Sequence, residues 1–433
     1  MYWFIGIKGT GMAALATMLH DLGNEVAGSD LEKHFFTEDE LVKRGIQIYP
    51  FCKDNIKDGY TVIIGNAFLE DFEEVQAARS NPTCTCYRYH EFLGKLIENY
   101  RSVAICGSHG KTTTTTMAKT VFEVFTKTGY LIGDGEGYLD PESEVFCFEA
   151  DEFRRHFAKY YPDYAIINNI EIDHVDYFKD EDDYFNAYQE FAGNVKEGIF
   201  YNGDDPWCRK LIFDVPAFSF GFGEDNDFSI ANLEEDSDGS SFDLLFRGNS
   251  FFRYHLKFVG THLLYDALGV ISLATMMGYD PNRIEAALNR FIGPKRRYVV
   301  EEYKDSVFVD DYAHHPTEVK VTIEATRKRY PDREIIAVFK PHRASRVKYF
   351  VQDFADALKI ADKVYLLDFT SIDDKQDGTD IDIHYLADIL PGSVVLSEDE
   401  EGARELAKHH GAVYLFMSSK DIYNIAEWTK EHI

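Results

Sequence analysis

The sequence lacks the features that mark membrane, secreted and disulfide-rich proteins. No run reaches about 18 apolar residues, so no segment is expected to span a bilayer. The N-terminus MYWFIGIKGTG runs straight into a glycine loop without the pattern of a signal peptide. Cysteines are few and no two stand in a C-x-x-C pair, so we expect reduced thiols, no zinc site and a cytoplasmic protein. The cysteines are Cys52, Cys84, Cys86, Cys106, Cys147 and Cys208.

Basic residues are also scarce. The 433 residues include 45 Lys and Arg against 75 Asp and Glu, a formal charge of −30. Such a charge repels nucleic acids and anionic membranes, so we expect neither as a partner. A local basic pocket for a phosphorylated small molecule remains compatible with it.

Short apolar runs alternate with helical segments along most of the chain, which predicts an α/β protein of three domains. We expect an N-terminal Rossmann-like parallel sheet over residues 1–98 and a central P-loop ATPase-type domain over 99–293. A C-terminal Rossmann-like α/β domain should follow over 294–433, because Gly293-Pro294 breaks the preceding helix. Residues 217–258 have short strands and turn signals, and predict a small antiparallel flap on the central domain.

A first glycine loop follows the opening strand. Gly9-Thr10-Gly11-Met12-Ala13-Ala14 fits G-x-G-x-x-A at the start of a helix, and Asp30 closes the next strand. The glycines let the backbone approach a diphosphate whose charge the helix N-terminus stabilises. The loop predicts a nucleotide site of unspecified type. The alternative is a glycine turn that only tightens strand-to-helix packing.

A second glycine loop, Gly107-Ser108-His109-Gly110-Lys111-Thr112-Thr113, follows the strand SVAIC. Its amides can cradle phosphates, Lys111 can reach the β and γ oxygens, and the Thr112 hydroxyl can hold Mg²⁺. Ile105 stands where the strict pattern has its first glycine, so this is a variant P-loop. The alternative is a threonine-rich helix start with a solvated lysine.

Two candidate metal ligands end later strands. Glu149 ends EVFCFE, and His174 follows DYAIINN. At the carboxyl ends of strands beside a P-loop, they are candidate ligands or organisers of Mg²⁺. Their plain alternatives are a helix cap and a surface histidine.

Small basic clusters stand out in the last third of this acidic chain. Arg296 and Arg297 lie at the linker, and the segments 310–316 and 340–346 end two consecutive strands. Arginine forks bind two oxygens of a phosphate or carboxylate together, which predicts anion sites here. A helix N-terminal turn with solvated arginines is the alternative for 343–346.

The segments GSHGKTTTT, FEADEF, NNIEIDH, KRRY and DDYAHHPTEV occur in this order across nearly the whole chain. With them, the chain resembles the Mur ligase family, the ATP-dependent ligases of bacterial peptidoglycan precursor synthesis. FIGIKGTGM, EFRRHF, DDYAHHPTEV and PHRASR are most similar to the branch that adds L-alanine to UDP-N-acetylmuramate. The resemblance implies ATP and Mg²⁺ as cofactors and an acyl-phosphate intermediate. Whether the protein is a monomer or a homodimer stays open.

The resemblance also implies roles for individual residues. The first loop would hold UDP and not NAD, through Gly9, Thr10, Gly11, Met12, Ser29, Asp30, Asn66 and Ala67, with Phe68 nearby. ATP would contact Gly107, Ser108, His109, Gly110, Lys111, Thr112, Thr113, His262, Asp266, Asp311 and Tyr312. Mg²⁺ would be held by Thr112, Glu149 and His174. Catalysis would involve Lys111, Glu149, His174, a linker arginine at Arg296 or Arg297, and His314. The amino acid and the reacting centre would face His342, Arg343 and Arg346.

Two positions depart from the family pattern. Leu263 and Asp266 stand where the family often has asparagines, which puts the adenine contacts in question. Tyr188 stands where related ligases carry a carbamylated lysine, so we expect no carbamate. His314 and His315 are both candidates for the base that deprotonates the amine. Three other functions stay open: a recycling ligase for a preformed tripeptide, an NAD-dependent oxidoreductase, and a nucleotide-binding regulator without turnover.

Overall fold

The computed structural model describes residues 1–236, 238–294, 296–370, 374–375 and 378–433. The chain divides into two compact units. The first joins Met1–Glu171 with Glu181–Ile292, and the second joins Ile172–Asp180 with Gly293–Ile433. The short segment Ile172–Asp180 therefore packs with the C-terminal part, although the sequence on both sides of it belongs to the first unit.

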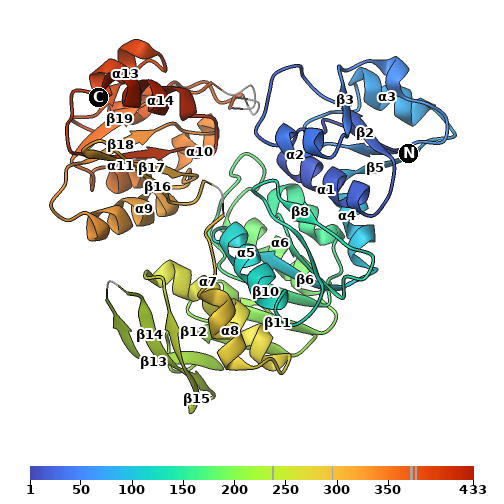
Figure 1. Ribbon diagram of the computed structural model, residues 1–433, viewed down its shortest axis with the longest axis horizontal. Coiled ribbons are helices and arrows are strands. Elements are labelled where there is room, and N and C mark those ends of the chain that lie inside the picture. Colours follow the sequence, from blue (N-terminus) through green and yellow to red (C-terminus); the bar gives the residue numbers. More distant parts are fainter. Residues whose placement is uncertain (237, 295, 371–373, 376–377) are drawn as a thin grey trace. The chain divides into compact units, whose positions relative to one another are not determined.

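The N-terminal part of the first unit, blue in Figure 1, is built on a five-stranded parallel sheet. Its strand order is β3-β2-β1-β4-β5. Alternate apolar residues of its strands, such as Trp3, Ile5, Val62 and Ile64, are buried in one core. The order reverses at β1, so a crevice-forming switch point lies between the carboxyl ends of β1 and β4. The strands are β1 (Tyr2–Ile5), β2 (Val26–Ser29), β3 (Gln47–Tyr49), β4 (Thr61–Ile64) and β5 (Thr85–Arg88), and the helices are α1 (Thr10–Asp21), α2 (Glu38–Lys43), η1 (Lys53–Asn55), α3 (Glu73–Ser80) and α4 (Tyr89–Ile97).

The described residues of the central part form a ten-stranded sheet in the order β15-β14-β13-β12-β11-β10-β6-β9-β7-β8. Helices α5, α7 and α8 bury an apolar core against one face of it. On α6, Tyr188 and Phe191 pack against Phe157 of η2. The strands are β6 (Arg101–Cys106), β7 (Thr128–Leu131), β8 (Gly137–Tyr138), β9 (Val145–Glu149), β10 (Tyr164–Ile167), β11 (Gly198–Asn202), β12 (Ala217–Gly221), β13 (Phe228–Glu235), β14 (Ser240–Phe246) and β15 (Asn249–Leu256); the helices are α5 (Lys111–Phe122), η2 (Phe153–Lys159), α6 (Glu181–Ala192), η3 (Cys208–Lys210), α7 (Thr261–Met276) and α8 (Pro281–Leu288).

The expected flap corresponds to β13, β14 and β15, which pair antiparallel. It does not stand apart, because β13 pairs in parallel with β12 and so continues the central sheet. The predicted α/β fold class, with a parallel central sheet and an antiparallel extension, is confirmed.

The described C-terminal residues form a six-stranded sheet in the order β16-β17-β21-β18-β19-β20, with β16 antiparallel at its edge. Ile336 and Val338 of β18 face a core shared with α13 and α14. On the other face, Phe339 packs against Phe354 of α11, and α9 lies beside α11 (Figure 1). The strands are β16 (Val299–Tyr303), β17 (Ser306–Asp311), β18 (Ile335–Phe339), β19 (Lys363–Leu366), β20 (Val394–Val395) and β21 (Val413–Met417); the helices are α9 (Pro316–Arg329), α10 (Ala344–Tyr349), α11 (Val351–Leu358), α12 (His384–Ala387), α13 (Glu400–Leu406) and α14 (Tyr423–His432).

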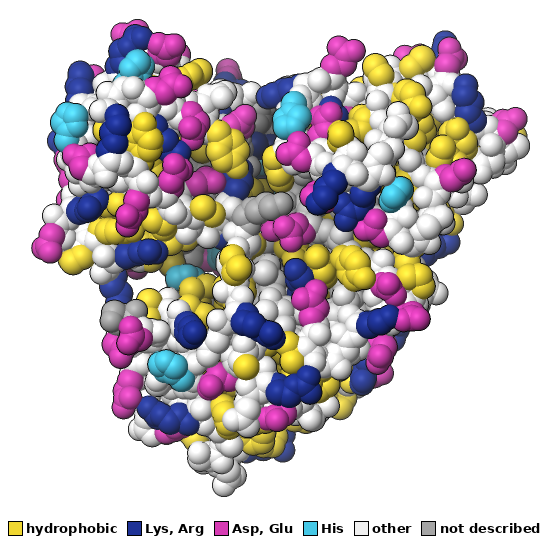
Figure 2. All heavy atoms as spheres, in the orientation of Figure 1, with side chains coloured by type: hydrophobic (Ala, Val, Ile, Leu, Met, Phe, Trp, Pro, Cys, Tyr) yellow, Lys and Arg dark blue, Asp and Glu magenta, His cyan; other side chains and the backbone are white. Residues whose placement is uncertain are grey.

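Acidic and basic side chains are interspersed on the face shown in Figure 2 and do not gather into one large patch of a single sign. Among the described residues, no helix combines the length and the apolar character needed to cross a membrane.

Candidate active site

The second glycine loop joins β6 to α5 and depends on two glycines with positive φ. Gly107 has φ 144° and Gly110 has φ 81°. A Cβ atom on Gly110 would lie 2.4 Å from Oδ1 of Asp266 and 2.9 Å from Nδ2 of Asn168, so a side chain does not fit. The loop lies at the carboxyl end of a parallel strand and opens a helix, where free amides can bind phosphate. This geometry fits the predicted phosphate-binding role.

Lys111 opens α5, and its ammonium group has three acceptors. Nζ donates to the Gly107 carbonyl at 2.6 Å, to the Ser108 carbonyl at 3.4 Å and to Oε2 of Glu152 at 2.8 Å. Burial lowers the pKa of Lys111, but the negative charge of Glu152 and its neighbours outweighs burial and raises this pKa above its usual value. Lys111 is therefore a permanent cation at the start of the helix.

Sequence reasoning missed Glu152, whose side chain is 1% exposed. The available signal was its place in FEADEF, three residues after Glu149, at the end of a strand next to the P-loop strand.

Ser108 and His109 tie the loop to the residues that follow β10. The Ser108 hydroxyl donates to the Glu171 carbonyl at 2.6 Å, and His109 N donates to Oδ1 of Asn169 at 2.9 Å. Nε2 of His109 also lies 2.9 Å from Oε2 of Glu171. The side chains of Ser108, His109 and Asn169 hold the loop in shape. The contact of the loop with phosphate stays a prediction. Asn169 was not among the predicted residues.

Thr112 and Glu149 offer two side-chain oxygens beside Lys111 as candidate metal ligands. The Thr112 hydroxyl donates to Oε2 of Glu149 at 3.3 Å, and Gly133 N donates to Oε1 of the same carboxylate. Hydroxyl and carboxylate oxygens are the ligands that Mg²⁺ prefers. The donor set therefore fits the predicted metal. Thr113 follows in the first turn of α5.

The two departures from the family pattern lie on α7. Asp266 is buried and accepts from Nδ2 of Asn168 at 3.2 Å, which places it directly below Gly110. Leu263 packs against the central core, so an apolar residue suits its position. His262 lies exposed in the first turn of α7. The adenine contacts of His262 and Asp266 stay predictions.

The first glycine loop starts α1 in the N-terminal part. Gly9 is the N-terminal cap of α1, followed by Thr10, Gly11 and the buried Met12. A Cβ atom on Gly11 would lie 2.7 Å from the Tyr89 hydroxyl, so glycine is required there.

Asp30 and Ser29 close β2 next to this loop. The Asp30 carboxylate accepts from Lys8 N at 2.7 Å and Leu31 N at 2.8 Å, and burial raises its pKa. The fully buried Ser29 donates to Glu74. The Asp30 side chain therefore braces the loop, whereas the Ser29 side chain ties β2 to α3. Asn66 and the exposed Ala67 follow β4 at the switch point.

In the second unit, the two linker arginines have different partners. Arg296 donates to the Ser418 carbonyl at 2.7 Å and the Lys420 carbonyl at 3.0 Å. Arg297 lies 3.6 Å from Glu318, and both guanidinium groups lie over the Tyr312 ring. Arg296 is thus tied to the segment that follows β21. Lys295 of the KRRY segment lies outside the described residues.

Asp311 and His314 end β17 and precede α9. The buried Asp311 carboxylate accepts from the amides of Tyr298 and Ala313, each at 2.8 Å, while burial raises its pKa to about 6. Nδ1 of His314 lies 3.1 Å from both the Tyr312 carbonyl and Glu318. Burial lowers the pKa of His314, which keeps the ring neutral as a general base requires.

The residues predicted to contact the amino acid lie at the start of α10: His342 and Arg343 precede it, and Arg346 is in its first turn. Arg346 is 2% exposed and holds Asp173 with two bonds, Nε to Oδ1 at 2.8 Å and Nη2 to Oδ2 at 3.1 Å. It also donates to the His342 carbonyl at 3.2 Å, and Arg343 pairs with Asp176. These two pairs fasten Ile172–Asp180 to the C-terminal part, and His174 lies in that segment with φ 51°. The metal role of His174 and the amino-acid contacts of the arginines stay predictions.

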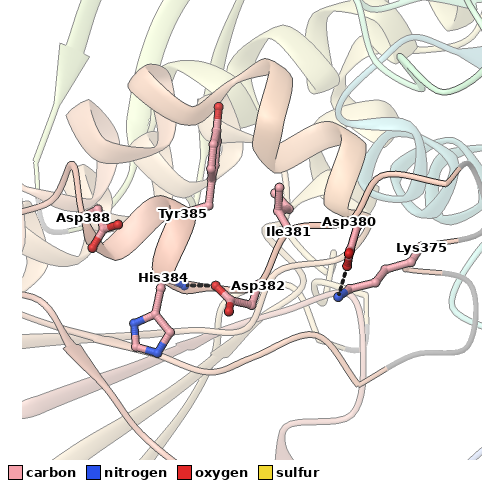
Figure 3. A pocket seen from close by; sticks show the side chains of 7 residues that line it. All are labelled: Lys375, Asp380, Ile381, Asp382, His384, Tyr385 and Asp388. Atoms are coloured by element: carbon pink, nitrogen blue, oxygen red, sulfur yellow. Dashed lines mark hydrogen bonds and ion pairs between the residues drawn. The ribbon is translucent and has the colours of Figure 1, made fainter.

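A separate hollow lies in the second unit, lined by Lys375, Asp380, Ile381, Asp382, His384, Tyr385 and Asp388 (Figure 3). Lys375 and Asp380 point toward each other at 3.3 Å. Three aspartates make it unsuited to phosphate, and it contains none of the predicted site residues.

Comparisons with known proteins cover nearly the whole chain. Residues 2–101 match the Mur ligase family catalytic domain, 105–274 the Mur ligase middle domain and 295–420 the Mur ligase glutamate ligase domain. The UDP-N-acetylmuramate–L-alanine ligase of Lacticaseibacillus casei is 44% identical over 421 residues, which are 97% of this chain and 96% of that protein.

Two solved structures share the fold. A UDP-N-acetylmuramate-alanine ligase from Thermotoga maritima has a TM-score of 0.81 at 24% identity, covering 100% of this chain and 98% of its own. A murein peptide ligase from Psychrobacter arcticus has a TM-score of 0.77 at 22% identity, with the same coverage.

Proposed function

Because the chain belongs to the Mur ligase family, we propose that it is an ATP-dependent ligase that adds L-alanine to UDP-N-acetylmuramate in peptidoglycan synthesis. The observation that carries the proposal is the similarity over 97% of the chain to a ligase of that name. The partly buried Lys111 cation at the start of α5, in the loop shaped by Gly107 and Gly110, supports the use of ATP.

The chemistry follows from the charges at the site. The lactyl carboxylate of the substrate attacks the γ-phosphate of ATP, which gives an acyl phosphate and ADP. The amine of L-alanine then attacks the acyl carbon, and phosphate leaves. The first step brings an anion toward a polyanion, so Lys111 and the P-loop amides must hold and neutralise the phosphates beforehand. His314, neutral and partly buried, is the group that we assign as a candidate acceptor of the amine proton.

We assign the metal site to Thr112, Glu149 and His174, with Mg²⁺ as the cation; when bound, it would neutralise phosphate charge. We also propose domain boundaries near residues 98 and 293, a cytoplasmic location, and a monomer or homodimer as the working form. UDP would lie at the switch point of the N-terminal sheet, near Gly9, Gly11, Asn66 and Ala67.

A test is phosphate release from ATP and Mg²⁺ with UDP-N-acetylmuramate, with and without L-alanine. Release that requires both substrates, with the alanyl product found by mass, is the expected result. Release with a tripeptide but not with L-alanine would instead favour the recycling ligase. Failure with both acceptors would refute the proposal.

A further inference from the structure

Asn66 lies at the switch point of the N-terminal sheet. Ile5 and Ile64 are register partners at the carboxyl ends of β1 and β4, and Gly65 N donates to the Ile5 carbonyl at 3.0 Å. The chain leaves β4 there and passes beside the first glycine loop, where a Cβ atom on Gly6 would overlap the ring of Phe68. Ligands of parallel sheets bind in this crevice.

Two histidines hold the Asn66 side chain from both sides. Nδ1 of His90 lies 3.3 Å from Oδ1 of Asn66, and Nδ2 of Asn66 lies 3.4 Å from Nδ1 of His156. Since the amide oxygen accepts and the amide nitrogen donates, His90 carries its proton on Nδ1 and His156 does not. The rings are stacked, with centroids 4.2 Å apart and planes 12° apart. His90 comes from α4, and His156 comes from η2 of the central part.

The turn that carries His156 has a backbone that ordinary residues avoid. Arg154 and Arg155 have φ of 51° and 57°. Arg155 anchors the turn to α6 through Asp183 at 2.7 Å and Glu190 at 3.3 Å. Strained residues of this kind persist where the surroundings over-determine them, and they cluster at functional sites. This turn brings His156 against Asn66.

The protonation state of the pair suits this bond pattern. Burial, followed by the neighbouring His156, lowers the pKa of His90 to about 4. His90 is therefore neutral near pH 7, so it stacks on its partner without the repulsion of two cations.

We propose that His90 and His156 are positioning residues for the UDP-sugar substrate. Both amide atoms of Asn66 are bonded to the two rings, so the loop that continues into the exposed Ala67 is fixed before substrate arrives. Fixing the loop in advance removes an ordering cost from binding. The inference rests on the proposed function, since it assumes that a UDP-sugar occupies this crevice.

Paired variants separate hydrogen bonding from packing. His156→Phe keeps an aromatic ring but loses the acceptor, whereas His156→Asn loses the ring but places an amide oxygen near the position of Nδ1. Calorimetry of the full chain with UDP-N-acetylmuramate should show Kd raised about five- to tenfold in the Phe variant, the size of one hydrogen bond. The Asn variant should recover to within about twofold of wild type. The opposite order would mean that the rings act by packing alone and would overturn the proposal.

His255→Phe is the matched control, because His255 is exposed on β15. It should leave Kd unchanged.

The turnover assay gives a second test. The His156→Phe variant should raise KM for the UDP-sugar but leave KM for ATP unchanged; an equal rise in both would overturn the proposal. If His156→Phe does not fold, Asn66→Ala removes the same bond, and an unchanged Kd there would overturn it as well. Binding without turnover in wild type would refute only the proposed function, whereas absence of binding would refute both.

Discussion

Replacing Asp173 with Asn should destabilise the second unit strongly. The Asp173 and Arg346 side chains are 6% and 2% exposed and share two bonds, so the substitution leaves a buried guanidinium without its counter-charge. Removing one partner of such a pair typically costs about 3–5 kcal/mol. Hydrogen exchange of the amides in α10 should therefore accelerate by about two to three and a half orders of magnitude. A loss below about 1 kcal/mol would refute the reasoning.

The pH dependence of stability gives an independent check on the contribution of this ion pair. Burial alone would raise the pKa of Asp173, but Arg346 and nearby histidines outweigh it and hold this pKa well below the usual 3.8. The pair therefore stabilises the fold above about pH 4, and this contribution is lost as the pH falls through the lower, folded pKa. The Asp173→Asn variant should not show this loss of stability at low pH. Glu400→Gln is the control, because its pair with Arg404 is more than half exposed and should contribute less than about 1 kcal/mol.

Three further predictions concern single side chains. Lys111→Ala should lower turnover by at least about 100-fold, as expected for loss of one preorganised cation, and near-normal turnover would exclude that role. Glu149→Ala should shift the Mg²⁺ dependence of turnover to higher concentration; an unchanged titration would remove Glu149 from the metal site. Asp311 has a pKa raised by burial to about 6, so the folded state holds its proton more tightly than the unfolded state. Stability should therefore fall as pH rises from about 4 to 6, and Asp311→Asn should flatten this slope in urea unfolding, while an unchanged slope would count against the raised pKa.

Much of the fold could be predicted because its signals are local. The two glycine loops each sit between a short apolar strand and a helix, and the structure has β1 and α1 around the first and β6 and α5 around the second. The apolar runs in the last third of the chain form β17, β18, β19, β20 and β21. What periodicity could not show is that residues 228–256 continue the central sheet, since the parallel pairing of β12 with β13 depends on their meeting in space.

The site residues also divide into those with a local sequence signal and those whose partners are set only by the folded chain. Lys111, Thr112 and Glu149 were accessible from a motif and from the end of a strand. The partner of Lys111, Glu152, was not, because an acidic residue after a strand gives no sign of which cation it meets. The pair of His90 and His156 was equally hidden, because the two residues lie 66 positions apart and their rings meet only in the folded chain.

The membership of Ile172–Asp180 in the second unit has a consequence for how the chain is made and dissected. Asp173 is synthesised long before Arg346, which follows 173 residues later in the chain. The Asp173 carboxylate therefore stays solvated until nearly four fifths of the chain has been synthesised and Arg346 is present. A fragment that starts at Gly293 would carry Arg346 and Arg343 into its interior without Asp173 and Asp176. The C-terminal part is thus not a continuous piece of sequence, because its fold includes a segment from the middle of the chain.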